Sequence, residues 1–134
     1  MSQPVSTDRP TVLVVDDEED LRDIVRRMLE RRGFDILVAG DPEQAIATCR
    51  DHRGDIDALI TDLTLPGGSG GDLSRSAVAM RPGMGVVYIS GLPKDLAVNK
   101  GLIAADALLV TKPFTSEVLI AALRSVIDRT DPPE

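Results

Sequence analysis

The segment Thr11–Asp20, TVLVVDDEED, joins a hydrophobic run directly to five consecutive acidic residues. The hydrophobic half is continuous and rich in β-branched residues, a pattern that predicts a strand buried on both faces. Such a strand gains nothing from like charges at its end, because neighbouring carboxylates repel one another. We interpret Glu18, Glu19 and Asp20 as residues that favour the start of a following helix. Asp16 and Asp17 are candidates for a binding site.

Composition narrows the class of protein. With 134 residues, 43% of them hydrophobic and 28% charged, the chain is expected to form one soluble domain. The net charge of −7 argues against direct binding to nucleic acid. No apolar stretch approaches the roughly 20 residues of a membrane helix, and the first ten residues lack a signal-peptide pattern, so we expect no membrane contact and a cytoplasmic location. The single cysteine, Cys49, excludes an internal disulfide.

Hydrophobic runs and helical patterns alternate along the rest of the chain. Four more strands are expected, over Phe34–Gly40, Asp57–Leu63, Val86–Ser90 and Ala107–Thr111. The helices are expected over Asp20–Arg32, after Asp41–Pro42, over Asp72–Met80, in a short stretch after Ser90, and after Thr115. This alternation predicts an α/β fold, a doubly wound five-stranded parallel sheet with five helices. The predicted domain covers residues 11–129, with loose tails at 1–10 and 130–134.

Polar residues end four of the expected strands. Asp16 and Asp17 follow the first, Asp62 ends the third, Ser90 ends the fourth, and Lys112 follows the fifth. Because the carboxyl ends of parallel strands form one edge of a sheet, these side chains should meet there. Three converging carboxylates favour a hard dication bound through oxygen, and Mg²⁺ is the expected ion. An aspartate beside a lysine, a hydroxyl and Mg²⁺ can act as a nucleophile towards a phosphoryl group.

Four short motifs in this order resemble a known family. They are VVDDE at 14–18, TDLTLPGGSG at 61–70, YISG at 88–91 and TKPF at 111–114. Together they resemble the receiver domain of two-component response regulators, of the single-domain or hybrid-kinase type. The resemblance covers about Thr11 to Arg129 and implies a flavodoxin-like (βα)5 receiver fold. It also implies a phosphoprotein that accepts a phosphoryl group in a phosphorelay and signals through protein contacts, not an enzyme.

The resemblance assigns roles to the residues at this edge. It makes Asp62 the phosphoacceptor, and it has Asp17 bind Mg²⁺ directly while Asp16 acts mainly through a coordinated water. The backbone carbonyl of Thr64 completes the protein ligands of the metal, in addition to Asp62.

The remaining motif residues act on the phosphoryl group. Ser90 supplies the hydroxyl that turns towards it, Lys112 pairs with its oxygens, and Pro113 follows through a cis peptide bond. The implied partners are a sensor histidine kinase or a histidine phosphotransfer protein, together with an unidentified downstream protein.

Two other classes of protein share parts of this pattern. An aspartyl-phosphate phosphatase of the dehalogenase-like type would place a second acid two residues after the nucleophile, where this chain has Thr64. A flavodoxin-like cofactor binder shares the architecture, but the acidic edge is unsuited to a flavin phosphate. The segment Pro66–Gly71 lacks the lysine of a phosphate-binding loop, and we interpret it as a flexible loop beside Asp62.

The sequence departs from the receiver pattern three residues before Lys112, where most receivers have an aromatic residue. This chain has Leu109, which offers neither a ring nor a hydroxyl to report the active state. The preceding segment contains NKG at 99–101, a helix stop signal that predicts a short, bent or mobile fourth helix. We therefore expect phosphorylation to act on Gly91–Ala105.

Overall fold

A five-stranded parallel sheet lies at the centre of the protein, whose computed structural model describes residues 9–130. Its strands are β1 (Thr11–Val15), β2 (Asp35–Ala39), β3 (Ala58–Asp62), β6 (Gly85–Ser90) and β7 (Leu108–Thr111). Five helices connect or follow them within these residues: α1 (Glu19–Glu30), α2 (Pro42–Asp51), α3 (Gly70–Met80), α4 (Lys94–Asn99) and α5 (Ser116–Thr130). The predicted doubly wound fold is confirmed.

The strand order is β2-β1-β3-β6-β7, and every neighbouring pair is parallel. The chain leaves β1 on one side to form β2 and then returns to place β3 on the other side. The order therefore reverses between β1 and β3, and in open parallel sheets a ligand binds at such a switch point. The carboxyl ends of these two strands carry the acidic residues singled out above.

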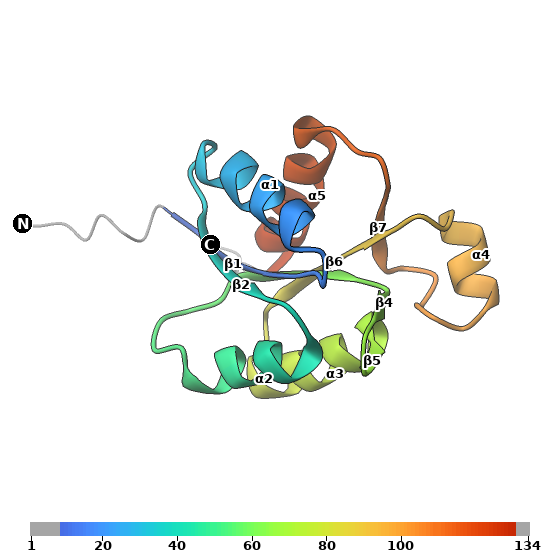
Figure 1. The fold of residues 1–134 in the computed structure, drawn as a ribbon, viewed down its shortest axis with the longest axis horizontal. Coiled ribbons are helices and arrows are strands. Elements are labelled where there is room, and N and C mark those ends of the chain that lie inside the picture. Colours follow the sequence, from blue (N-terminus) through green and yellow to red (C-terminus); the bar gives the residue numbers. More distant parts are fainter. Residues whose placement is uncertain (1–8, 131–134) are drawn as a thin grey trace, which may run out of the picture.

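Helices cover both faces of the sheet (Figure 1): α1 and α5 lie on one face and α2 and α3 on the other. Successive residues of a strand point to opposite faces of the sheet, as the period of two requires. On β1, Val12 and Val14 pack in the core under α1 and α5, and Leu13 and Val15 pack in the core under α2 and α3. All four are at most 1% exposed, which explains why this strand is continuously hydrophobic.

Two residues at helix ends adopt conformations that their residue types favour. Gly33 follows α1 with φ of 95°, a conformation that costs an L side chain free energy and suits glycine. Asp41 caps α2, where its side chain accepts a hydrogen bond from the Gln44 N–H at 2.8 Å. Pro42 then occupies the first helical position.

The glycine-rich segment after β3 differs from its expected form. A two-stranded hairpin of β4 (Thr64–Leu65) and β5 (Gly68–Ser69) replaces the expected flexible loop. Helix α3 begins at Gly70, two residues before the predicted start. Ser69 caps it by accepting a hydrogen bond from the Asp72 N–H at 3.0 Å.

The fourth helix is short, as expected. It spans six residues and ends before Gly101, whose φ is 75°. In Figure 1 it projects from the body of the domain beside the β7 edge of the sheet. Ala97 is its one buried residue, and the neighbouring Leu96 is 45% exposed.

At the ends of the domain, the expected tails lie mostly outside the described residues, which exclude 1–8 and 131–134. The Arg9 side chain donates to the Phe34 carbonyl at 3.1 Å and to Asp35 at 2.9 Å, and the Pro10 carbonyl accepts from the Asp35 N–H. Residues 9 and 10 are thus attached to β2, and α5 extends to Thr130. Among the described helices, none has the length and hydrophobicity needed to cross a membrane.

Candidate functional site

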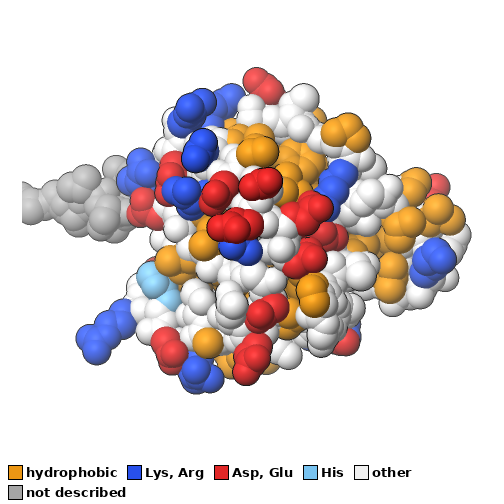
Figure 2. Space-filling view, in the orientation of Figure 1, with side chains coloured by type: hydrophobic (Ala, Val, Ile, Leu, Met, Phe, Trp, Pro, Cys, Tyr) orange, Lys and Arg blue, Asp and Glu red, His pale blue; other side chains and the backbone are white. Residues whose placement is uncertain are grey.

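Three carboxylates meet where β1 and β3 end. One oxygen from each of Asp16, Asp17 and Asp62 lies within 4.8 Å of the other two. The parallel register explains this, because Val15 pairs with Thr61, and the residues that follow this pair, Asp16 and Asp62, therefore come to the same edge of the sheet. Figure 2 shows acidic side chains gathered over this part of the surface, around the start of α1. A cluster of this kind suits an oxygen-liganded cation.

Asp16 is the buried member of the cluster, with 4% exposure. Its Oδ1 accepts a hydrogen bond from the Glu18 N–H at 2.8 Å, and its backbone carbonyl accepts from Arg22 at 3.0 Å. Burial raises the pKa of the Asp16 carboxyl, while the Glu18 N–H and Lys112 act to lower that pKa. The negative charges of Asp62 and Asp17 add to the rise. A bound cation would therefore stabilise the ionised form of Asp16.

Lys112 approaches the cluster from the end of β7. Its Nζ donates to Asp62 Oδ2 at 3.0 Å, and the two side chains are only 30% and 16% exposed. Burial lowers the pKa of Lys112, but the hydrogen bond and charge of Asp62 outweigh it and leave that pKa above its ordinary value. The lysine remains charged, and the peptide bond that joins it to Pro113 is cis, as the resemblance implied.

Ser90 ends β6 between β3 and β7 and is 5% exposed. Its Oγ accepts a hydrogen bond from the Leu92 N–H at 3.0 Å, and its carbonyl accepts from the Lys112 N–H at 2.8 Å. On the other side, Asp62 pairs in register with Ile89, the residue before Ser90. The hydroxyl therefore lies at the same sheet edge as Asp62 and Lys112.

Thr64 lies on β4, the first strand of the hairpin that follows Asp62. Its N–H donates a long hydrogen bond of 3.5 Å to Asp62 Oδ1. Asp62 thus has one oxygen beside Lys112 and the other beside the Thr64 backbone. The assignment of the Thr64 carbonyl as a metal ligand stays a prediction.

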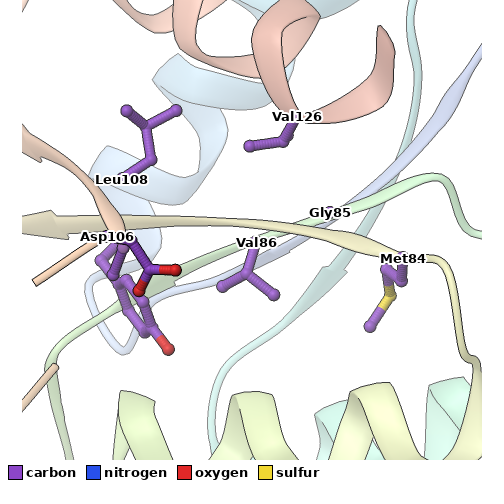
Figure 3. Close-up of a pocket in the computed structure, with 8 residues that line it drawn as sticks. Met84, Gly85, Val86, Asp106, Leu108 and Val126 are labelled. Carbon is purple, nitrogen blue, oxygen red and sulfur yellow. The ribbon is translucent and has the colours of Figure 1, made fainter. Parts of the chain in front are cut away.

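The cavity in Figure 3 lies at the other end of the sheet. It has a volume of about 350 Å³ and is lined by the start of β6 at Met84–Val86, the start of β7 at Asp106–Leu108, and Val126 of α5. These are amino ends of parallel strands, whereas the carboxylates lie at carboxyl ends. The cavity is therefore not part of the acidic site.

Two contacts of this site were not anticipated from the sequence. One is the Arg22 hydrogen bond to the Asp16 carbonyl. The other is the packing of Gly70, where an added Cβ would lie 2.1 Å from the Asp62 carbonyl oxygen. The spacing of Arg22 after the acidic pair could have suggested the first, since one turn of helix brings it back towards the strand end. No local signal distinguishes Gly70 from its neighbouring glycines.

The geometry combines three chemical functions around one carboxylate. Asp16 and Asp17 can share a cation with Asp62, and Lys112 supplies a fixed positive charge. Ser90 supplies a hydroxyl at the same edge. Such an arrangement can neutralise negative charge that approaches Asp62, and a phosphoryl group carries that charge.

Comparison with known proteins gives a consistent result. The family model of the response regulator receiver domain matches residues 12–124. The probable transcriptional regulatory protein TcrX of Mycobacterium tuberculosis is 38% identical over 122 residues, which are 90% of this chain and 50% of the relative. The DNA-binding response regulator MtrA of Mycobacterium bovis is 32% identical over 95% of this chain and 54% of its own length. The chain thus spans about half the length of these curated relatives.

Solved structures support the same fold. A response regulator receiver protein from Sinorhizobium medicae superposes with a TM-score of 0.80 at 28% identity, over 93% of this chain and 99% of that one. The receiver domain of the hybrid histidine kinase CckA superposes with a TM-score of 0.73 at 27% identity, over 87% and 98% of the two chains.

Proposed function

The chain belongs to the response regulator receiver domain family of two-component systems, and we propose that Asp62 is its phosphoryl acceptor. The observation that carries this proposal is the double environment of Asp62. Its carboxylate lies within 4.8 Å of Asp16 and Asp17 and also 3.0 Å from Lys112 Nζ. Among the described residues, one carboxylate is therefore shared between a cation-binding cluster and a fixed positive charge.

The reaction is a displacement at phosphorus. A carboxylate oxygen of Asp62 attacks the phosphorus of a phosphohistidine, a P–O bond forms, and the P–N bond breaks. The electron pair of that bond returns to the imidazole, which takes up a proton. The phosphoryl donor is a sensor histidine kinase or a histidine phosphotransfer protein. The product is an acyl phosphate on Asp62, and the chain acts as a phosphoacceptor that assists its own reaction.

The metal in this proposal is Mg²⁺. The donor set fits a hard cation, because every side chain in the cluster offers a carboxylate oxygen and Asp16 is destabilised by burial when ionised. Asp16, Asp17 and Asp62 would hold the ion together with the Thr64 carbonyl. When bound, Mg²⁺ neutralises charge on the phosphoryl oxygens.

Lys112 and Ser90 act on the phosphoryl group from the other side. In the structure Lys112 is paired with Asp62, so it moves from the carboxylate to the phosphoryl oxygens when the acyl phosphate forms. Ser90 exchanges its present hydrogen bond from the Leu92 N–H for one that it donates to the phosphoryl group. This exchange frees the backbone after β6.

We assign the output to the segment that follows. Gly91–Ala105 contains the six-residue helix α4, whose one buried residue is Ala97. An element with so few buried residues belongs to the low-stability end of the fold. Phosphorylation shifts or orders this segment, and downstream proteins bind it together with β7 and α5. Hydrogen exchange measured with and without beryllofluoride and Mg²⁺ tests this output route. Unchanged exchange rates across residues 91–105 would contradict it.

The remaining functional assignments follow from charge and family. The relatives named as DNA-binding are about twice the matched length, and we propose that the receiver region itself makes no direct contact with nucleic acid because its net charge is −7. We also propose a cytoplasmic location without membrane contact, since the kinases of such systems transfer phosphoryl groups there.

The phosphoacceptor is tested with acetyl phosphate and Mg²⁺. Intact mass should show one added phosphoryl group on the wild type and none on Asp62→Asn. Asp51→Asn is a matched control, since Asp51 is an exposed aspartate on α2. Labelling of Asp62→Asn to the wild-type extent would remove Asp62 from its role.

A further inference from the structure

Two buried hydroxyl groups join α3 to β6. Ser74 on α3 is 5% exposed and Tyr88 on β6 is 8% exposed, and their oxygens lie 2.6 Å apart. The Ser74 Oγ also donates to the Gly71 carbonyl at 2.9 Å. A carbonyl only accepts, so the single proton of Ser74 is committed to Gly71 and Tyr88 must donate to Ser74. The direction of both hydrogen bonds is therefore fixed.

The Tyr88 ring lies in a different environment from its hydroxyl. It packs in a small apolar cluster with Leu63, Ala97 and Ile103. Leu109 packs against the same cluster and is the register partner of Tyr88 on β7. The ring also lines the cavity at the start of β7 described above. One side chain thus contacts the segment that follows α4 through its ring and α3 through its hydroxyl.

The amino end of α3, which this hydroxyl holds, rests on the backbone of Asp62. The Gly70 N–H donates to the Leu63 carbonyl at 2.8 Å, and a Cβ on Gly70 would lie 2.1 Å from the Asp62 carbonyl oxygen. A Cβ on Gly71 would lie 2.9 Å from the Leu102 carbonyl oxygen. The start of α3 is therefore enclosed between Asp62 and the segment after α4.

We propose that Tyr88 is a positioning residue for the Asp62 site: through Ser74 its hydroxyl fixes the start of α3 against Asp62, and its ring couples that position to residues 102–109. The inference rests on the proposed phosphoryl acceptance at Asp62. The Tyr88 hydroxyl bonds to Ser74 and its ring packs in the apolar cluster, so it acts indirectly, by holding the backbone that carries Asp62 and the β4–β5 hairpin.

Two variants remove the contact from its two sides. Tyr88→Phe deletes the donor and keeps the ring, and Ser74→Ala deletes the acceptor and leaves the tyrosine hydroxyl buried without it. Ser76→Ala is the matched control, because Ser76 is an exposed serine on the same helix. Tyr88→Phe keeps the test open if Ser74→Ala does not fold, since it leaves the packing of the ring intact.

The first measurement is the rate of labelling by acetyl phosphate as a function of Mg²⁺. We expect Tyr88→Phe and Ser74→Ala each to raise the Mg²⁺ half-saturation or lower the labelling rate by about three- to tenfold, the worth of one hydrogen bond. The double variant should lose no more than Ser74→Ala alone, because both single changes remove the Ser74–Tyr88 hydrogen bond and only Ser74→Ala also removes the bond to the Gly71 carbonyl. A contact that served stability alone would lower the melting temperature and leave these two site parameters at the Ser76→Ala values.

The second measurement is spectroscopic. The chain has one tyrosine and no tryptophan, so its intrinsic fluorescence reports Tyr88 alone. Beryllofluoride with Mg²⁺ should change this emission in the wild type and in Ser76→Ala, and the change should be at least halved in Ser74→Ala.

The outcomes separate the two proposals. A wild type that neither labels nor responds to Mg²⁺ refutes the phosphoacceptor function and this inference with it. A wild type that labels, with both Tyr88→Phe and Ser74→Ala equal to Ser76→Ala in rate and half-saturation, refutes the positioning role alone.

Discussion

Replacement of Gly70 by alanine tests how closely α3 must approach Asp62. Gly70 does not have a positive φ, so its backbone conformation suits any L residue. Steric crowding is what opposes a side chain at this position. The new Cβ would lie 2.1 Å from the Asp62 carbonyl oxygen and 3.1 Å from the Leu63 Cα, both of which are backbone atoms. Ordinary contact begins at 3.4 Å, so the start of α3 must move by roughly 1.3 Å.

The expected loss of stability follows from this displacement. Overpacking of a close-packed interior costs about 1 to 3 kcal/mol, and a backbone neighbour that cannot rotate away places Gly70→Ala at the upper end of that range. Alanine recovers up to about 1 kcal/mol through its higher helix propensity. The net loss of about 2 kcal/mol should lower the melting temperature by roughly 6 to 10 °C for a domain of this size.

Thermal unfolding with and without Mg²⁺ measures the effect. Gly91→Ala is the control for stability, because an added Cβ there meets no atom within 4 Å, and it should change the melting temperature by less than about 2 °C. Gly70→Ala should also label more slowly, since the moved backbone carries Asp62. Equal melting temperatures for the two variants would refute the reasoning from close approach.

Four further outcomes follow from the same structure. Mg²⁺ at ten times its Kd should stabilise the wild type by about 1.4 kcal/mol, and Asp17→Asn should abolish most of the accompanying rise in melting temperature. This rise should be larger at pH 7 than near pH 4, because burial raises the pKa of Asp16 above 3.8 and ionisation destabilises the metal-free protein as pH rises through that pKa; a rise that grows on acidification would contradict it. Arg81→Lys should lose about 1 to 3 kcal/mol in chemical denaturation, since the Arg81 guanidinium donates to the carbonyls of Cys49, His52 and Gly54 and an ammonium cannot reach all three; an unchanged denaturation midpoint would show that these bonds contribute nothing net. Leu109→Tyr should leave acetyl phosphate labelling within about twofold, because Leu109 packs against the apolar cluster of Tyr88 and offers no polar group to the site, and a larger loss would show that position 109 contributes to phosphorylation.

The hydrophobic pattern of the sequence was sufficient to predict the strands, the helices and the parallel sheet. Periods of two and 3.6 in hydrophobicity specify strands and helices, and their alternation specifies a parallel sheet. In such a sheet the last residues of the strands must share an edge, so Asp16, Asp17, Asp62, Ser90 and Lys112 could be brought together without coordinates. Their individual roles remain proposals.

The short fourth helix and the residues at helix ends also follow from local sequence. The NKG segment predicted a short α4, and Gly33 and Asp41 take the conformations that their residue types favour. These are local effects, in which the backbone of a few residues and one side chain settle the outcome.

Only the tertiary structure decided the segment between Asp62 and α3. A run of glycines has low helix propensity and shows no hydrophobic period, so its sequence predicts a flexible loop. The fold instead makes a hairpin there and starts α3 at Gly70. This position lies so close to the Asp62 carbonyl that only a residue without a Cβ fits. The Ser74–Tyr88 hydrogen bond could not be predicted from the sequence either. Its two residues are adjacent only because α3 packs across β6, and contacts between distant segments leave no period in the sequence.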